Sequence, residues 1–212
     1  NEGAGGAITI NGGTITASGG GGAAGIGGGL FGAGGTITIN GGTVTAIGES
    51  GAGIGSGSFG SGGTITINGG TITATYTVLS SGIGAGSGGS NVTLEVHGNA
   101  FIIASSISAQ TDKDTWSGVI FEGSAGQVYG NPILETDAEI PGDKTLTILQ
   151  DRTLTIGNGV TLTNNGSVDN HGTIQKNGMI INNGTIKNYG TVQGNGAVEG
   201  NPILYQSGTV VT

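Results

Sequence analysis

Two carboxylates and the single tryptophan of the chain lie close together in the sequence, at Asp112, Asp114 and Trp116. A tryptophan face can stack on a sugar ring, while nearby carboxylates accept hydrogen bonds from its hydroxyl groups or hold a cation. Asp-Lys-Asp lacks the remaining ligand positions of a calcium loop. These three residues are therefore a candidate glycan-binding site, and the alternative is a solvated loop whose tryptophan packs over the fold.

Elsewhere the residue types that carry out catalysis are sparse. His97 and His171 have no obvious nucleophile or carboxylate partner, and no Gly-x-Ser-x-Gly elbow occurs. An enzyme acting on acidic polysaccharides would need paired carboxylates or an aspartate cluster for calcium, whereas Asp169, Lys176 and Lys187 stand singly. We therefore predict no catalysis, no metal site and no cofactor, and calcium binding stays open although no motif indicates it.

The elements that must position these residues belong to a repeat with a period of about 28–29. In its clearest copy, GTITINGGTVTA, aliphatic residues alternate with threonines on both sides of Asn-Gly-Gly. Such alternation predicts strands with one buried face, and Asn-Gly-Gly allows a sharp bend between them. The bend position holds Asn11, Asn40, Asn68 and then His97. Since stacked asparagines can bond to one another, these four residues are predicted to form a structural ladder.

Each repeat contains three short strands, which predicts a three-sided coil. The aliphatic columns are Ile8, Ile37, Ile65 and Leu94; Ile15, Val44, Ile72 and Phe101; and Ile26, Ile54 and Ile83. A single repeat could also form a hairpin, but a hairpin array would not need a constant period or a third strand. We therefore predict an all-β fold, a right-handed parallel β-helix of about 8 rungs stacked at about 4.8 Å.

The repeat shortens after Gly126. Leucines first recur every eight residues, and residues 164–200 then follow a six-residue pattern with aliphatic residues at Val168, Ile174, Ile180, Ile186, Val192 and Val198. Three hexads make one coil, so the coil length would fall from about 28–29 to about 24 and then to about 18. Residues 1–126 are thus predicted to form the long coils, and 127–212 a continuation with shorter coils and a C-terminal cap or linker. A separate left-handed or β-roll domain after residue 126 is the alternative.

The charge pattern argues against two classes of partner. Net charge is −8, and no lysine or arginine precedes Lys113. The first half therefore lacks the basic surface of a nucleic-acid-binding protein. No apolar run approaches the length of a membrane span, so membrane insertion is not expected.

Threonine rows lie opposite the inward isoleucines. Thr36 and Thr38 recur as Thr64 and Thr66 in the next repeat, and Glu95 interrupts the row in the fourth. Stacked Thr-x-Thr rows resemble the surfaces of ice-binding solenoids, although exposed strands favour threonine in any case. Ice binding is therefore a further alternative function.

The repeat GGTITINGGTVTA with GAGIGSG resembles the Gly-rich repeats of large surface proteins of Gram-positive bacteria that carry carbohydrate-binding-type parallel β-helix domains. The Asn-x-Gly-Thr-Ile pattern of the tail is similar to tails of the same kind of protein. This resemblance implies an extracellular, cell-surface location and a role in adhesion or contact with polysaccharide or host glycan. We expect a non-catalytic adhesin or stalk, and the alternative is a structural spacer or filament subunit that associates end to end.

Overall fold

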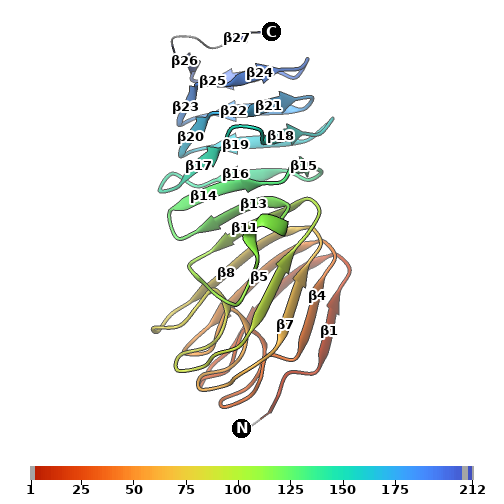
Figure 1. Ribbon diagram of the computed structural model, residues 1–212, viewed down its shortest axis with the longest axis vertical. Helices are drawn as coiled ribbons and strands as arrows, with labels where there is room; N and C mark the ends of the chain where they lie inside the picture. Colours follow the sequence, from red (N-terminus) through yellow and green to blue (C-terminus); the bar gives the residue numbers. More distant parts are fainter. Residues whose placement is uncertain (1–2, 207–209, 212) are drawn as a thin grey trace. The chain divides into compact units, whose positions relative to one another are not determined.

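The computed structural model describes residues 3–206 and 210–211 and is built almost entirely of short β-strands (Figure 1). The chain divides into two compact units, Asn1–Trp116 (unit 1) and Ser117–Thr212 (unit 2). The sequence predicts the boundary ten residues later, after residue 126, where the period changes. Part of the predicted C-terminal cap, at 207–209 and 212, lies outside the described residues.

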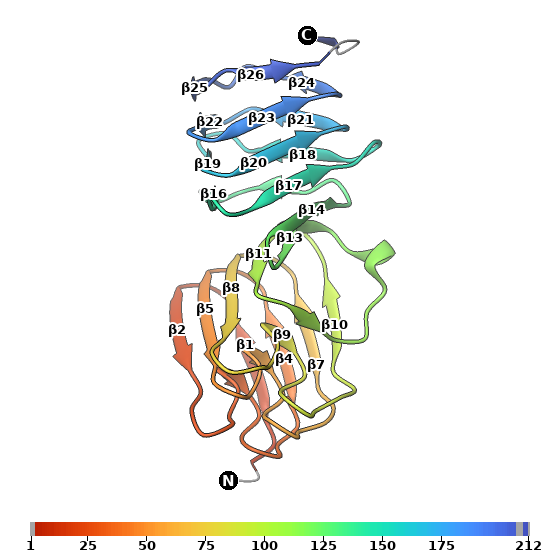
Figure 2. The ribbon, with the colours of Figure 1, turned by 90° about the vertical axis from the view of Figure 1, so that its left-hand side faces the viewer.

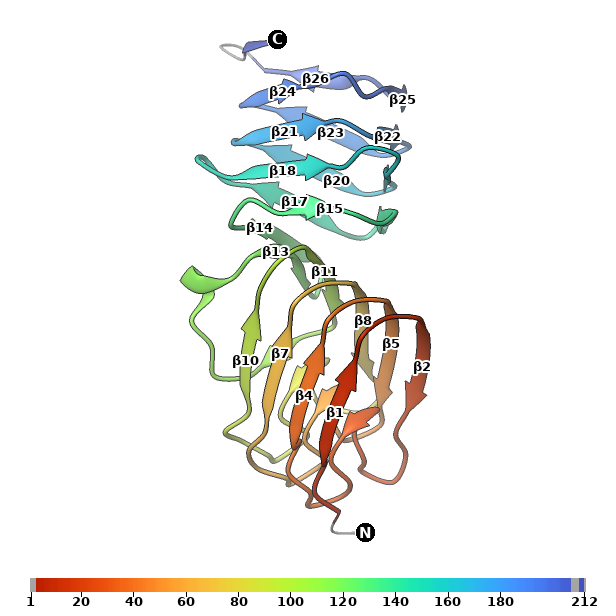
Figure 3. The ribbon, with the colours of Figure 1, turned by 90° about the vertical axis from the view of Figure 1, so that its right-hand side faces the viewer.

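Unit 1 consists of four coils, and each coil contributes one strand to each of three parallel sheets. The first sheet contains β1 (Ala7–Ile10), β4 (Thr36–Ile39), β7 (Thr64–Ile67) and β10 (Thr93–Val96), which lie side by side in Figure 3. The second contains β2 (Thr14–Ser18), β5 (Thr43–Gly48), β8 (Thr71–Tyr76) and β11 (Ala100–Ala104). The third contains β3 (Ile26–Gly27), β6 (Ile54–Gly55), β9 (Ile83–Gly84) and β12 (Ile107–Ser108).

Equivalent residues of successive coils pair in register, as the repeat predicts. Ile37 lies between Ile8 and Ile65, and both Ile37 and Ile65 are buried. The intervening threonines face outward because side chains alternate between the two faces of a strand. Each fully buried isoleucine contributes about 1.5–3 kcal/mol by leaving water. The predicted parallel β-helix is therefore confirmed, and the hand of its coils stays a prediction.

One predicted column is wrong in the fourth coil. The repeat period aligns Phe101 with Ile72, but Phe101 pairs with Thr71, and Ile102 pairs with Ile72. The bend that begins at His97 is one residue longer than the Asn-Gly-Gly bends of the earlier coils, so the strand after it is shifted by one position. Both Phe101 and Ile102 are buried, so the shift brings an additional large side chain into the core.

The third sheet depends on a column of glycines at Gly27, Gly55 and Gly84. Their φ angles of 134°, 140° and 125° lie in a region that only glycine adopts readily. A Cβ on Gly55 would lie 1.9 Å from the carbonyl oxygen of Gly84 in the next coil. The Gly-Ile-Gly strands are therefore glycine-rich because both backbone conformation and close coil contact require it.

Unit 2 begins with an antiparallel hairpin, which the repeat pattern of the sequence does not predict. Strands β13 (Gly118–Glu122) and β14 (Ala125–Tyr129) pair antiparallel, and Gly123 in their connection has a φ of 62°. From β14 onward every strand pair in the described part of unit 2 is parallel. The hairpin therefore precedes the second stack of coils.

Three sheets also form the parallel part of unit 2. The first is β14, β17 (Thr145–Ile148), β20 (Ser167–Asn170), β23 (Thr185–Asn188) and β26 (Ile203–Tyr205), of which Figure 2 shows the last four stacked in order. The second is β15 (Ile133–Leu134), β18 (Thr153–Ile156), β21 (Thr173–Lys176), β24 (Thr191–Gln193) and β27 (Val210–Val211). The third is β16 (Ala138–Ile140), β19 (Thr161–Asn164), β22 (Met179–Asn182) and β25 (Val198–Gly200).

The register of unit 2 confirms that three hexads make one coil. Val168 pairs with Ile186, and Ile174 pairs with Val192, so hexad residues separated by three hexads stack directly. The earlier coils of this unit are longer, since Gly126 pairs with Leu146 and Leu146 with Val168. The spacing between paired residues in these coils ranges from 20 residues, for Gly126 and Leu146, to the expected 24, for Ala138 and Leu162.

Candidate functional site

The predicted site at residues 111–116 forms a short 3-10 turn, η1 (Lys113–Thr115). Asp112 precedes the turn, and its carboxylate accepts a hydrogen bond from the Asp114 N–H at 3.1 Å. Its carbonyl oxygen accepts the Thr115 hydroxyl at 2.8 Å. One of the two candidate carboxylates is therefore engaged in holding the local backbone turn.

Trp116 follows this turn and is only 3% exposed. The Lys113 ammonium lies 5.4 Å from the centre of the indole ring, within reach of a cation–π interaction. Stacking a sugar on this ring, as the sequence suggested, would require the ring to leave its packing. The burial of Trp116 agrees with the alternative interpretation in that its side chain is packed and not exposed on the loop.

No group of three or more His, Cys, Asp or Glu side chains in the described residues is arranged to hold a metal ion. Asp112 and Asp114 are exposed and have no third carboxylate or histidine beside them in that part of the chain.

The bend asparagines of unit 1 form a chain of side-chain hydrogen bonds. The amide of Asn40 donates to the Asn11 oxygen, and Asn68 donates to Asn40, both at 2.8 Å. His97 occupies the fourth position, where its backbone N–H bonds to Ile67 and its ring lies 3.5 Å from the Glu95 carboxylate. The three asparagines thus bond to one another, which is the arrangement expected of a structural ladder.

Unit 2 contains a second set of hydrogen-bonded asparagines, which is not among the site residues predicted from the sequence. Asn164 donates to Asn182 at 2.8 Å, and Asn170 donates to Asn188 at 2.5 Å. All four side chains are buried. The available signal was their position two residues after an inward aliphatic residue, which in a strand places both on the same face. These asparagines therefore lie at the ends of their strands with their side chains inside the coil. We call each row of such hydrogen-bonded asparagines an inner ladder.

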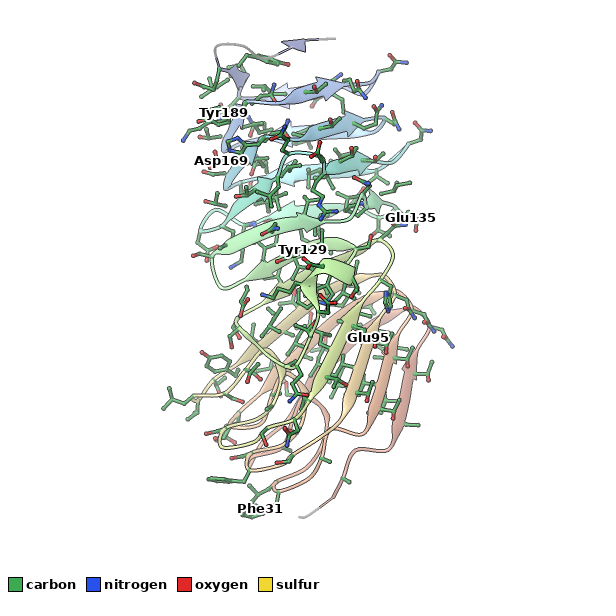
Figure 4. All side chains as sticks on the ribbon, viewed as in Figure 1. Phe31, Glu95, Tyr129, Glu135, Asp169 and Tyr189 are labelled. Atoms are coloured by element: carbon green, nitrogen blue, oxygen red, sulfur yellow. The ribbon has the colours of Figure 1, made fainter. Side chains whose placement is uncertain are left out.

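Unit 1 also carries an exposed aromatic pair that is not among the candidate site residues predicted from the sequence. Phe31 and Phe59 are 56% and 61% exposed, and their rings stack with centroids 5.7 Å apart. Figure 4 shows Phe31 projecting from the β3–β4 loop. Both residues have positive φ angles, 60° and 57°, which is unusual for a bulky residue. The third coil has Gly88 at this position with a φ of 69°, so the turn itself does not need an aromatic residue.

A cleft lies in unit 1 beside the last of the Gly-rich loops. Its volume is about 360 Å³, and its lining residues are Ala85, Gly89, Ser90, Asn91, Val92, Ile107, Ser108, Ala109 and Gln110. A smaller hollow of about 210 Å³ in unit 2 is lined by Gly184, Thr185, Asn201, Pro202 and Leu204. The larger cleft is lined by neutral side chains, several of which can both donate and accept hydrogen bonds.

Comparison with known proteins bears on the fold. A family model described as a beta helix repeat matches residues 8–30 and 37–58, which fall in the first two coils of unit 1. No curated protein matches the chain, and no solved structure matches it. No helix in the described residues is long and apolar enough to span a membrane. The repeat match and the parallel register of both units together identify the chain as a parallel β-helix solenoid.

Proposed function

We propose that this chain is a non-catalytic, extracellular module of a bacterial surface protein and acts as a rigid stalk. The observation that carries this proposal is the in-register repetition of identical residues, such as Thr38 on Thr66 and Ile39 on Ile67. Within unit 1, neighbouring coils pair through equivalent backbone positions and equivalent buried side chains, so this unit extends in one dimension as coils are added. The resemblance of the repeats to Gram-positive surface proteins supports the location.

A display experiment tests the stalk function. The full chain is placed between a cell-wall anchor and a reporter binding head on a Gram-positive cell, and capture of ligand-coated beads by the head is counted. A Gly/Ser linker of equal residue number is the control, because such a linker collapses to a coil whose ends are far closer than its contour length. We expect the chain to raise bead capture several-fold over this linker. Equal capture with both would contradict the stalk function.

A second candidate function is contact with polysaccharide through the stacked Phe31 and Phe59. Exposed aromatic residues in a strained backbone conformation often mark binding surfaces. We expect glycan-array signal for the unmodified chain and its loss in the double variant Phe31→Gly/Phe59→Gly. In the third coil the equivalent position is already a glycine, Gly88, and its φ of 69° is close to those of Phe31 and Phe59. The double variant should therefore retain the fold. Unchanged array signal in this variant would exclude the aromatic pair as the contact.

A further inference from the structure

The cleft in unit 1 arises where a regular stack of loops stops. The loops at 28–35, 56–63 and 85–92 belong to the first three coils and stack by backbone hydrogen bonds. Phe31 donates its N–H to Ser58, and Phe59 donates to Ser87, at 2.8 and 2.7 Å. Gly34 donates to Gly62 at 2.9 Å, and Gly62 donates to Ser90 at 2.8 Å.

The fourth coil contains no such loop. After β12 the chain passes directly to residue 110, where Gln110 donates its N–H to Val92 at 2.7 Å. Ser108 accepts a hydrogen bond from Ala85 at 2.8 Å, so this short segment stays against β9. Residues 107–110 therefore form one wall of the cleft, and the uncovered third loop forms the other.

Because the fourth coil has no such loop, two backbone N–H groups of the third loop lack the carbonyl partners that the next loop provides in the earlier coils. Gly88 and Asn91 occupy the positions of Phe59 and Gly62 one repeat later. Within the described residues neither the Gly88 N–H nor the Asn91 N–H has a hydrogen-bond partner. Open N–H groups along the edge of a ladder can pair with the carbonyl groups of another extended chain.

The lining of the cleft also suits a peptide backbone. The carboxamides of Gln110 and Asn91 meet at 3.5 Å, and each presents the donor and acceptor of a peptide group. Ile107 and Ala109 are partly exposed and supply an apolar surface. No lining residue carries a charge or an aromatic ring. The cleft therefore lacks a counter-charge for an ionic ligand and a flat ring on which a sugar could stack.

We propose that this cleft binds an extended, uncharged peptide segment rich in small residues, which adds a further loop to the stack through backbone hydrogen bonds. In the cleft, a carbonyl group of the bound segment accepts the N–H group of Asn91, and the two carboxamides separate to bond its peptide groups. The segment continues past the lining residue Gly89, so that a second carbonyl group accepts the N–H group of Gly88 at the edge of the cleft. Small side chains are required because glycine-rich loops pack closely, as Gly89 does against the Gly60 carbonyl. This peptide site is independent of the stalk function.

The test uses the full ¹⁵N-labelled chain and a capped peptide with the sequence of residues 84–92, GAGSGGSNV. This sequence is chosen because it stacks on the preceding loop in the structure itself. We expect the amide resonances of Gly88 and Asn91 to shift downfield and saturate as peptide is added. Cellohexaose is titrated in parallel as a neutral glycan.

Two variants locate the binding. Ser108→Tyr fills the cleft from an exposed position and should weaken peptide binding at least tenfold, whereas Ser18→Tyr, at an exposed strand end elsewhere in unit 1, should leave it unchanged. Circular dichroism confirms that both variants are folded. Equal weakening by both variants, or no shift at Gly88 and Asn91 with peptide, would overturn the proposal. Shifts at these residues with cellohexaose alone would replace the peptide with a glycan.

Discussion

Replacing Gly55 with alanine is expected to lower the free energy of unfolding of unit 1 by more than about 3 kcal/mol. Gly55 has a φ of 140°, a conformation that costs a residue with a Cβ about 1–3 kcal/mol. The new methyl group would also lie 1.9 Å from the Gly84 carbonyl oxygen, which belongs to the backbone and cannot move independently. The next coil must therefore shift, and the loss should be measured as a lower urea midpoint.

Gly41→Ala is the matched control for this substitution. Gly41 lies in the bend of the same coil, and a Cβ there would be 3.6 Å from the nearest atom, the Asn11 carbonyl oxygen. Its φ is not in the positive range, so alanine can adopt the native conformation. We expect a change within about 1 kcal/mol, and a small gain is consistent with a stiffer unfolded chain. Similar losses for both variants would show that coil contact at Gly55 is not the cause.

The second large effect is expected for Asn182→Leu in the inner ladder of unit 2. Asn182 is fully buried, accepts a hydrogen bond from Asn164 at 2.8 Å and donates to the Asn201 carbonyl at 2.9 Å. Leucine has a similar volume but removes both bonds. Because a buried polar group that loses its partner costs about 1–3 kcal/mol, we expect a loss of about 2–4 kcal/mol. Urea unfolding followed by circular dichroism measures it.

The neighbouring residue provides the comparison for the ladder. Asn183 donates to Asn165 at 2.9 Å across the same two coils, but this bond lies at the exposed corner. Water can replace the lost partner there, so Asn183→Leu should cost less than about 1 kcal/mol. The difference between the two variants isolates burial, since residue type, coil and bond length are nearly the same. Equal losses would mean that burial of the ladder adds nothing to its stability.

The sequence predicts the solenoid well because the solenoid depends on period. The alignment of Ile37 with Ile65, and of Val168 with Ile186, follows from counting residues, since identical positions stack in consecutive coils. The column that contained Phe101 fails for the same reason. Period alone cannot detect a single residue added to a bend when the bend sequence has changed from Asn-Gly-Gly to His-Gly-Asn-Ala.

The site was harder to predict, because burial and backbone conformation depend on contacts between coils. Trp116 and Asp112 are adjacent in sequence to polar residues, yet the tryptophan is buried and the carboxylate is engaged in a turn. The cleft depends on the absence of a loop that the earlier coils possess, and its donors Gly88 and Asn91 are ordinary turn residues in sequence. Only the stacked arrangement shows that their partners are missing.

The register between the first three coils has a consequence for how such a chain changes over generations. Because Ile37 pairs with Ile65 and Val44 with Ile72, a recombination event that duplicates or removes one whole repeat keeps every core column continuous. Each event changes the length of the stack by about 4.8 Å. The first and last coils of the stack keep their sequences. Similar neighbouring repeats also favour misaligned pairing of their DNA. Unit 1 can therefore change its length in whole coils by inheritance, without any new residue in its core.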